Sequence, residues 1–222
     1  MIDRLRRGML PPEKPTIALT FDDAYSDFHA VALPMLMRYE LTATLYVPTG
    51  YVGGHSGWMK AAGETQRAIL SWSQIEEVAA AGIEIGAHSH THPELDRLPD
   101  RALADEVARP KAVLEDHLGR AVRSFAYPYG DYDRRVRNAV ATAGYCGAVT
   151  MNSWTASAAD HPLELPRITV LDDTDVVTLA RRLVAGGGRA RRAALRARRV
   201  ATTQARRWRT PRDQRVRNRV GE

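Results

Sequence analysis

Short apolar runs alternate along the chain with longer segments in which apolar residues recur every three or four positions. The short runs predict strands at residues 16–21, 42–47, 83–87, 122–126, 145–150 and 165–170. The longer segments predict helices at residues 27–40, 73–81, 98–118, 133–143 and 174–185. Repeated alternation of strand and helix is typical of an α/β architecture with a mostly parallel sheet or barrel.

Prolines, glycines and capping residues indicate where these elements end. Pro34 is expected to kink the helix at 27–40 or to divide it in two, and Pro110 is expected to divide the helix at 98–118, because a proline inside a helix costs about 3 kcal/mol. Ser73 followed by Glu76 is a capping-box pattern that opens the helix at 73–81. The Gly-rich stretch 50–63 is expected to be a long loop, and such loops are more often functional than idle.

Charge is concentrated near the C-terminal end of the sequence. The 222 residues have a formal net charge of +6, but residues 186–222 contain 13 arginines against the acids Asp213 and Glu222, which leaves −5 on residues 1–185. We therefore expect three parts: an N-terminal extension at 1–14, a globular domain at 15–185, and an Arg-rich tail at 186–222 that is partly disordered or helical. The calculated pI of 9.8 describes the tail and not the domain.

The tail and the first residues bear on partners and location. The tail carries no recognised nucleic-acid motif, which argues against nucleic acid, and peripheral contact with an anionic membrane or an acidic polymer is the alternative to a solvated extension. No apolar run of signal-peptide or membrane-spanning length occurs. The sequence as written is therefore expected to be cytoplasmic or membrane-peripheral, and extracytoplasmic if the start codon is wrongly assigned. Cys146 is the single cysteine, which excludes an intramolecular disulfide.

Two polar clusters directly follow predicted strands, where parallel α/β folds gather ligands and catalytic groups. The first is the adjacent pair Asp22 and Asp23. In an extended chain the two side chains point to opposite sides, so one carboxylate can bind a metal while the other approaches a substrate water. A helix cap or a turn is the more common reason for such a pair.

The second cluster places three of the seven histidines, His88, His90 and His92, within five positions. Neutral imidazole is a frequent ligand of zinc and similar metals. A turn would bring His88 and His92 to one face and exclude His90, whereas an extended chain would align all three, and the spacing leaves both geometries open. With Asp23, His88 and His92 would form a site with open positions for water, as in hydrolytic metal enzymes, and Asp22 would remove the proton of that water.

The segments TFDDAYSDF, HSHTHP and FAYPYG, in this order and spacing, resemble three motifs of the polysaccharide deacetylase family, also known as the NodB-homology domain or carbohydrate esterase family 4. The resemblance covers about residues 15–183. It implies a distorted (β/α) barrel with fewer than eight regular strands. It also implies metal-dependent removal of acetyl groups from N- or O-acetylated sugars, with zinc as the expected ion and cobalt or nickel as alternatives.

The resemblance also assigns roles to individual residues. It implies that Asp22 is the catalytic base, Asp23 the carboxylate ligand of the metal, and His88 and His92 its histidine ligands. Tyr129 matches the residue whose backbone N–H holds the oxyanion. From the residues themselves, Trp58 in the Gly-rich stretch is a candidate to line the substrate groove, because aromatic faces stack on sugar rings, and packing in the core is the alternative.

The chain departs from the family pattern at two points. Ala126 stands where many members carry an arginine that orients the base, and the usual late leucine-x-histidine is not evident. In this respect the chain resembles a subgroup with YPYG and PRI-like motifs. We hypothesise that Arg167 supplies the guanidinium beside Asp22, because a nearby cation keeps a carboxylate ionised. The alternative is that Arg167 is a surface ion-pair partner at the start of a strand.

The expected function is therefore the metal-dependent removal of acetyl groups from a carbohydrate or glycoconjugate. An N-acetylated amino-sugar polymer or oligosaccharide is favoured over acetyl-xylan on family frequency. Two alternatives stay open: a non-catalytic carbohydrate-binding relic of the same fold, and a cyclic-imide or ureide hydrolase of the same superfamily. The presence of His88 and His92 together with Asp23 argues against the second alternative.

Overall fold

The computed structural model describes residues 16–185 apart from 62, 64, 158 and 172. The expected extension at 1–14 and the Arg-rich tail at 186–222 lie outside the described residues. Internal contacts divide the chain into a first unit, Met1–Met151 with Ala156–Arg167, and a second unit, Asn152–Thr155 with Ile168–Glu222. The first unit contains the whole sheet and every candidate site residue.

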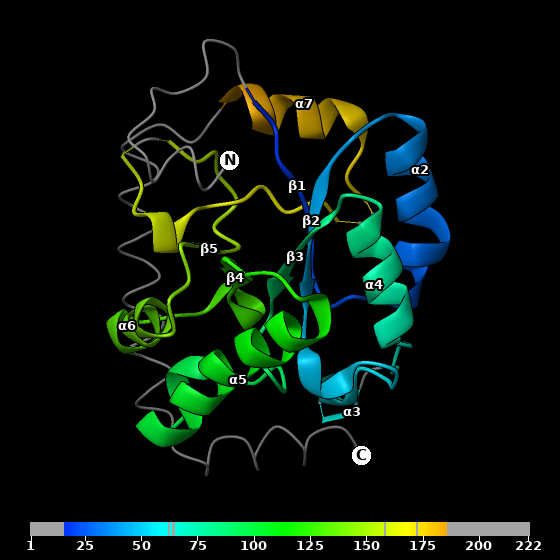
Figure 1. Ribbon diagram of the computed structural model, residues 1–222. Helices are drawn as coiled ribbons and strands as arrows, with labels where there is room; N and C mark the ends of the chain where they lie inside the picture. Colours follow the sequence, from blue (N-terminus) through cyan, green and yellow to red (C-terminus); the bar gives the residue numbers. More distant parts are fainter. Residues whose placement is uncertain (1–15, 62, 64, 158, 172, 186–222) are drawn as a thin grey trace, which may run out of the picture. The chain divides into compact units, whose positions relative to one another are not determined.

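The first unit is built on a five-stranded parallel sheet. Its strands follow one another in sequence order across the sheet (Figure 1). Sequential parallel strands joined through helices are the arrangement of a (β/α) barrel. The described residues form five strands in place of eight, which agrees with the expected distorted form. The strands are β1 (Leu19–Phe21), β2 (Ala43–Val47), β3 (Glu84–Ala87), β4 (Ser124–Ala126) and β5 (Gly147–Val149).

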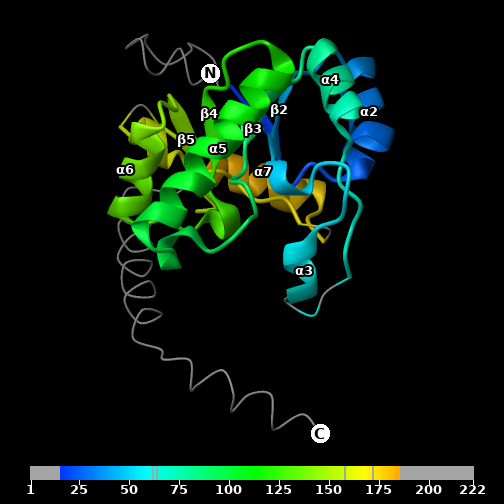
Figure 2. The same ribbon diagram turned by 60° about the horizontal axis from the view of Figure 1, so that its bottom comes forward.

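Helices occupy the connections between these strands. The larger ones, α2, α4, α5 and α6, lie outside the sheet, whereas α3 projects from one end of the unit (Figure 2). The α-helices are α2 (Leu33–Arg38), α3 (Gly57–Ala61), α4 (Trp72–Ala80), α5 (Asp100–Leu118) and α6 (Arg134–Thr142). The shorter turns are the π-helical η1 (Phe28–Ala32) and the 3₁₀ segments η2 (Thr49–Tyr51), η3 (Leu95–Arg97), η4 (Pro128–Gly130) and η5 (Pro162–Glu164).

The main apolar core includes strand and helix side chains that lie on facing surfaces. Leu45 of β2 and Phe125 of β4 are buried with Ile75 of α4 and Val107 of α5. Burying a side chain of this size stabilises the fold by about 1.5–3 kcal/mol. The next residue of β2, Tyr46, belongs to a separate small cluster with Ala126, Val149 and Leu165, because successive strand residues point to opposite faces of a sheet.

Up to residue 150 the five predicted strands match the structure in number and order, and each of the four predicted helical segments overlaps an α-helix, with three corrections in detail. Helix α5 runs unbroken through Pro110, whose side chain is buried on the same face as Leu103, Val107 and Leu114. Burial on this face offsets the lost hydrogen bond, so the expected division was wrong. Pro34 does separate η1 from α2, where it occupies the first turn.

The capping box of α4 is formed by Ser71 with Gln74, not by Ser73 with Glu76. The Ser71 hydroxyl accepts from the Gln74 N–H, and the Gln74 side chain accepts from the Ser71 N–H. Helix α4 therefore begins at Trp72, two residues earlier than the pattern around Ser73 would place a capped start. The stretch 50–63 is also more ordered than a loop, because it contains part of η2 and the whole of α3.

The sixth predicted strand, at 165–170, does not form. Leu165 makes a single parallel bridge with Val149, and no further strand pairing follows among the described residues. The next residue is Pro166, which has no N–H to donate to a ladder, so pairing ends after one residue.

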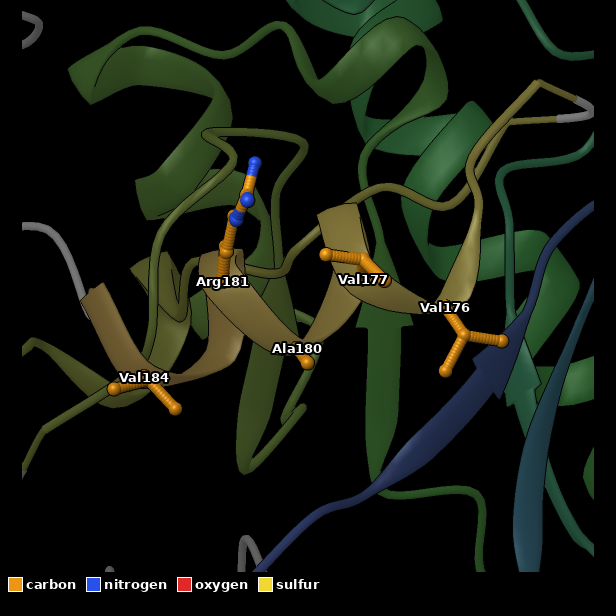
Figure 3. A pocket seen from close by; sticks show the side chains of 5 residues that line it. All are labelled: Val176, Val177, Ala180, Arg181 and Val184. Atoms are coloured by element: carbon orange, nitrogen blue, oxygen red, sulfur yellow. The ribbon is translucent and has the colours of Figure 1, made fainter.

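The second unit contains helix α7 (Val176–Ala185), which carries exposed apolar side chains. Val176 and Val184 are 83% and 89% exposed, and together with Val177, Ala180 and Arg181 they line an open, largely apolar pocket (Figure 3). None of the candidate site residues lines this pocket. Among the described residues, no helix has the length and apolar character needed to cross a membrane.

Candidate metal centre and catalytic site

The candidate site residues lie at the carboxyl ends of the parallel strands. Asp22 and Asp23 follow β1 directly, His88 follows β3, and Tyr129 lies in η4 shortly after β4. In (β/α) barrels the side chains at this end of the strands carry the chemistry. The topology therefore brings together residues that are more than 60 positions apart in the sequence.

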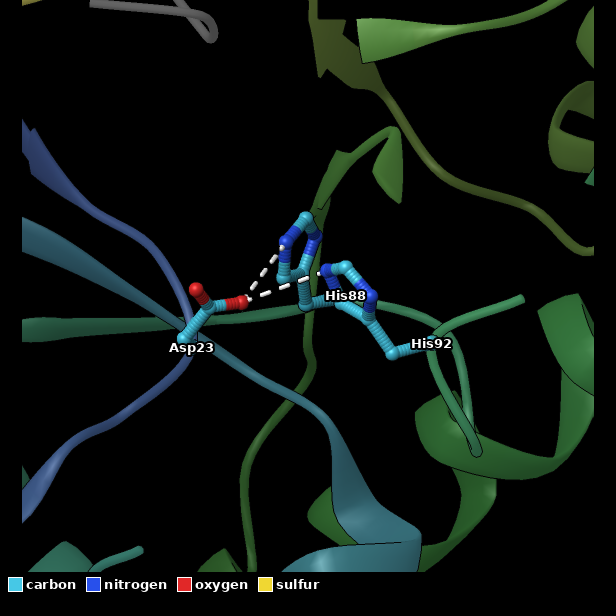
Figure 4. A group of neighbouring side chains, drawn as sticks. All are labelled: Asp23, His88 and His92. Carbon is cyan, nitrogen blue, oxygen red and sulfur yellow. Dashed lines mark ion pairs between the residues drawn. The ribbon is translucent and has the colours of Figure 1, made fainter. Parts of the chain in front are cut away.

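Asp23, His88 and His92 form a compact group of three potential metal ligands (Figure 4). The Asp23 Oδ1 atom lies 3.3 Å from the Nε2 atoms of both His88 and His92, and one ligand atom from each residue lies within 4.8 Å of the others. Asp23 Oδ1 is buried and makes no hydrogen bond with the described residues. A buried carboxylate oxygen facing two imidazole nitrogens without a hydrogen bond fits a divalent cation.

Unusual backbone angles give this group its geometry. Asp23 and Ala24 have φ values of 70° and 53°, and Ser89 and His92 have φ values of 61° and 57°. All four lie in the left-handed region, so the chain turns sharply after β1 and again around His92. The extended arrangement expected for Asp22 and Asp23 is therefore wrong.

The turn around Ser89 and His92 also decides between the two histidine geometries. His88 and His92 face Asp23, while the Nδ1 atom of His90 lies 2.9 Å from the Thr49 hydroxyl. The structure thus matches the turn that excludes His90 and not the extended chain that aligns all three histidines.

Electrostatic effects within the group favour an ionised Asp23. Burial alone would raise the pKa of Asp23, but the His88 and His92 imidazoles outweigh it and hold that pKa far below its usual value. Burial and the proximity of His88 lower the pKa of His92. For His88, burial acts in the same sense, but Asp23 and Asp22 outweigh it and raise its pKa.

Two further contacts fix the loop that carries the histidines. His88 Nδ1 lies 2.8 Å from the Ala126 carbonyl oxygen and must donate to it, which leaves Nε2 as the atom that faces Asp23. The carboxylate of Glu106, on α5, accepts from the backbone N–H groups of His90 and Thr91 at 2.8 Å and from the Thr91 hydroxyl at 2.5 Å. The loop is therefore held to a core helix through a buried carboxylate.

Asp22 and Arg167 form a bidentate ion pair beside this group. Arg167 Nη1 and Nη2 donate to the two carboxylate oxygens of Asp22 at 2.7 Å each. Nη1 also donates to the Thr20 hydroxyl at 2.9 Å, and Nε donates to the Thr150 carbonyl at 3.1 Å. The Arg167 side chain is only 15% exposed. The alternative hypothesis, that Arg167 is a surface ion-pair partner at the start of a strand, is therefore wrong.

The guanidinium determines the charge state of Asp22. Burial would raise the pKa of Asp22, but the charge and hydrogen bonds of Arg167 outweigh burial and lower it. Asp22 is consequently an ionised carboxylate at neutral pH, as a proton acceptor must be. Ala126 is fully buried and supplies only its backbone carbonyl, to His88.

Aromatic side chains surround His92. The Trp58 ring stacks on the His92 ring with centroids 4.5 Å apart and planes 22° apart. The Tyr129 ring meets His92 edge-on at 4.7 Å, and Tyr129 is 48% exposed with a left-handed φ of 58°. Trp58 and Tyr129 therefore both lie against His92, Trp58 on the face of the imidazole and Tyr129 at an edge contact.

Sequence reasoning missed Glu106, Thr20 and Thr150. Glu106 carries a signal, because it lies between the apolar positions Leu103 and Val107 on the buried face of α5. An acidic residue on such a face requires internal partners. Thr20 and Thr150 carry no comparable signal, since threonine is common in strands and only the fold brings both to Arg167.

Residues 10–148 match the family model described as polysaccharide deacetylase. This chain belongs to the polysaccharide deacetylase family. Among solved structures it is similar to the deacetylase PplD of Streptococcus pyogenes in complex with acetate, with a TM-score of 0.69 and 30% identity over 82% of this chain and 76% of that one. The fold and the sequence motifs therefore agree.

Two curated relatives also have names that refer to deacetylases. YxkH of Bacillus subtilis (strain 168), named for the polysaccharide deacetylases, is 28% identical over 159 residues, which are 72% of this chain and 53% of YxkH. Chitin deacetylase 1 of Cryptococcus neoformans is 26% identical over 145 residues, which are 65% of this chain and 27% of that protein. The chain thus spans about half the length of the first relative and about a quarter of the second.

Proposed function

We propose that the protein is a metal-dependent hydrolase that removes acetyl groups from an N-acetylated amino-sugar polymer or oligosaccharide. The single observation that carries this proposal is the position of the Asp22–Arg167 pair beside Asp23, His88 and His92. A potential metal site and an ionised carboxylate held next to it are the two parts that metal-assisted amide hydrolysis requires. The family membership supports the same reaction class.

The donor set favours zinc. Two imidazole nitrogens and one carboxylate oxygen are common zinc ligands, and a three-ligand protein site leaves a position for water. Cobalt and nickel accept the same donors. The ion bound by Asp23, His88 and His92 would polarise the acetyl carbonyl and lower the pKa of a water molecule.

The chain's own residues supply the remaining steps. Asp22 accepts the proton of the attacking water, and Arg167 keeps it ionised until then. The backbone N–H of Tyr129 stabilises the oxyanion of the tetrahedral intermediate. The proton taken up by Asp22 is then available to the leaving amine.

The substrate class rests on the relatives and on the aromatic rings at the site. Chitin deacetylase 1 is named for a polymer of N-acetylglucosamine, which favours an N-acetylated amino sugar over acetyl-xylan. Tyr129, which is 48% exposed, offers aromatic surface against which a sugar ring can pack, and Trp58 also lies against His92, with one indole face covered by that histidine. Contact of the Arg-rich segment 186–222 with an anionic membrane stays a prediction from the sequence, as does the cellular location.

The Asp22–Arg167 pair also weighs against a non-catalytic relic. Such a relic is favoured by two departures, Ala126 and the missing late histidine. Arg167 removes the first of these grounds, because it places a guanidinium 2.7 Å from both Asp22 oxygens. A cyclic-imide or ureide hydrolase without a full metal site has no need of the Asp23, His88 and His92 group.

The test measures metal content and acetate release separately. Purified full-length protein is stripped with a chelator, titrated with zinc, and assayed with N-acetylated chitooligosaccharides. Asp23→Ala and His88→Ala are expected to lose both zinc binding and acetate release, whereas Asp22→Asn keeps zinc and loses turnover. His117→Ala, which changes a histidine outside the site, serves as the control. Full zinc occupancy in His88→Ala would reject the ligand assignment.

A further inference from the structure

The two histidines of the candidate metal group are held in different ways. The Nδ1 atom of His88 has a backbone carbonyl partner, that of Ala126, at 2.8 Å. The Nδ1 atom of His92 is buried and has no hydrogen-bond partner among the described residues. Histidines that bind metals almost always have their second nitrogen hydrogen-bonded, which fixes the orientation of the ring. His92 therefore lacks the usual means of orientation.

A flat aromatic ring covers the face of His92 instead. The Trp58 indole lies 4.5 Å from the His92 ring, centroid to centroid, with an angle of 22° between the planes. Tyr129 and His88 contact the same imidazole edge-on, at 4.7 and 4.8 Å. Stacking restricts rotation of the imidazole out of its plane, and the two edge contacts restrict its tilt.

Trp58 is itself fixed by packing. The Tyr51 ring meets the indole edge-on at 4.9 Å, and the Tyr25 ring lies nearly parallel to it at 6.4 Å. Residue 57 is a glycine, and a Cβ there would lie 2.7 Å from the Tyr51 ring. Gly57 thus lets Tyr51 approach the start of α3 closely enough to support Trp58.

We propose that Trp58 is a positioning residue that fixes the His92 ring for metal binding, in the role that the Ala126 carbonyl has for His88. This inference rests on the proposed metal site and concerns a residue outside the segments TFDDAYSDF, HSHTHP and FAYPYG. It also limits the expected sugar contact of Trp58, because the indole face that covers His92 is not available to a substrate.

The chain provides a matched control for this proposal. Trp72 and His117 form a second stacked pair, with centroids 3.7 Å apart and planes 7° apart. His117 does not belong to the metal group. A change at Trp72 therefore removes a tryptophan–histidine stack of similar geometry without touching the proposed ligands.

The experiment measures the zinc affinity of the full-length protein by competition with a chromophoric chelator. Trp58→Leu keeps apolar volume but removes the flat ring, and it is expected to weaken zinc binding by about 10- to 100-fold, the usual effect of losing an outer-shell partner of a ligand. Trp58→Phe keeps a flat ring and is expected to stay within about threefold of wild type. Trp72→Leu is expected to leave the affinity unchanged.

A second readout separates positioning from simple packing. In cobalt-substituted protein, the visible absorption bands report the ligand geometry, and they are expected to change in Trp58→Leu but not in Trp72→Leu. Melting temperatures of the metal-free variants show whether each one is folded. If Trp58→Leu does not fold, Trp58→Met, which is also apolar and not flat, is measured in its place.

The outcomes distinguish this inference from the proposed function. Wild-type affinity and an unchanged cobalt spectrum in Trp58→Leu, or in Trp58→Met where it is used, would overturn the positioning role and leave the metal site intact. An equal loss of affinity in Trp72→Leu would show a general effect of stability and would also overturn it. Failure of the wild-type protein to bind zinc at all would remove the proposed function and this inference together.

Discussion

Replacement of Arg167 by methionine removes the group that keeps Asp22 ionised. The wild-type guanidinium makes two contacts with Asp22 at 2.7 Å, one with Thr20 at 2.9 Å and one with Thr150 at 3.1 Å. Methionine has a similar reach but no donor, so Asp22, whose side chain is 24% exposed in the wild-type protein, loses its counter-ion. Removing one member of a buried ion pair costs 3–5 kcal/mol, and the partial exposure of Asp22 places this site near the lower end, at about 3 kcal/mol.

The loss of stability in Arg167→Met depends on pH with a definite sign. Arg167 lowers the pKa of Asp22, so the pair stabilises the wild-type protein fully at neutral pH and less as the pH falls through the folded-state pKa. In the variant, burial without a counter-ion raises the pKa of Asp22. The difference in free energy of unfolding between the two proteins is therefore expected to be largest near neutral pH and to shrink in acid. Denaturant unfolding at several pH values measures it.

The same change is expected to alter catalysis in a way that stability does not explain. The acidic limb of kcat/KM against pH should move to higher pH, because a larger fraction of Asp22 is protonated at any given acidic pH. Zinc affinity should stay close to wild type, since Arg167 makes no hydrogen bond or ion pair with Asp23, His88 or His92 in the part of the chain that the structure describes. A folded Arg167→Met protein with a wild-type pH profile would refute the assignment of Arg167 to Asp22.

The Arg137–Glu164 pair supplies the control. Its side chains are 29% and 17% exposed, and Arg137 Nη1 donates to Glu164 at 2.8 Å. Neither residue belongs to the candidate site. Arg137→Met is expected to lower the free energy of unfolding by about 1 kcal/mol and to leave the acidic limb of the pH profile unchanged.

Three other changes test separate parts of the structure. Gly86→Ala is expected to destabilise the fold by about 1–3 kcal/mol in thermal unfolding, because the added Cβ would lie 2.5 Å from the Tyr46 ring. Wild-type stability of this variant would show that the space between Gly86 and Tyr46 can accept a methyl group. Glu106→Ala should weaken zinc binding more than Glu106→Gln, because the glutamine amide oxygen can still accept from the backbone N–H groups of His90 and Thr91. Equal zinc affinities of the two variants in a titration would argue that Glu106 does not anchor the loop. Chelator treatment should stop acetate release and added zinc should restore it, and activity that survives complete removal of metal would exclude the proposed mechanism.

Much of the fold could be predicted because the strands of a parallel barrel are buried on both faces and appear as short apolar runs. All five strands lie within predicted ranges. The errors occur where one local signal competes with packing. Pro110 has the chemistry of a helix breaker, but burial on the core face of α5 outweighs it. At 165–170 the apolar pattern suggests a strand, but Pro166 cannot donate to the ladder.

The candidate site was predictable to the extent that single residues carry chemistry. Asp23, His88 and His92 have unambiguous ligand chemistry, and they come together because β1 and β3 end at the same edge of the parallel sheet. The Asp22–Arg167 contact could only be a hypothesis, suggested by the missing arginine at position 126. The two residues are 145 positions apart in the sequence. Local spacing contains no information about a contact over that distance. The His92 Nδ1 atom without a hydrogen bond and the stacking of Trp58 on His92 could not be predicted either. Both depend on side-chain geometry, which no pattern of residue types encodes.

Several residues of the site have left-handed backbone angles, which cost energy and must be held by contacts with the rest of the chain. Asp23, Ser89 and His92 are not glycines, and a residue other than glycine in the left-handed region costs about 1 kcal/mol or more. Such angles persist only where surrounding contacts hold them. The Ser89 hydroxyl accepts from the His92 N–H at 2.9 Å, and Glu106 holds the intervening residues through their backbone. These contacts offset the cost of the left-handed residues and hold the loop in the geometry that directs His88 and His92 toward Asp23.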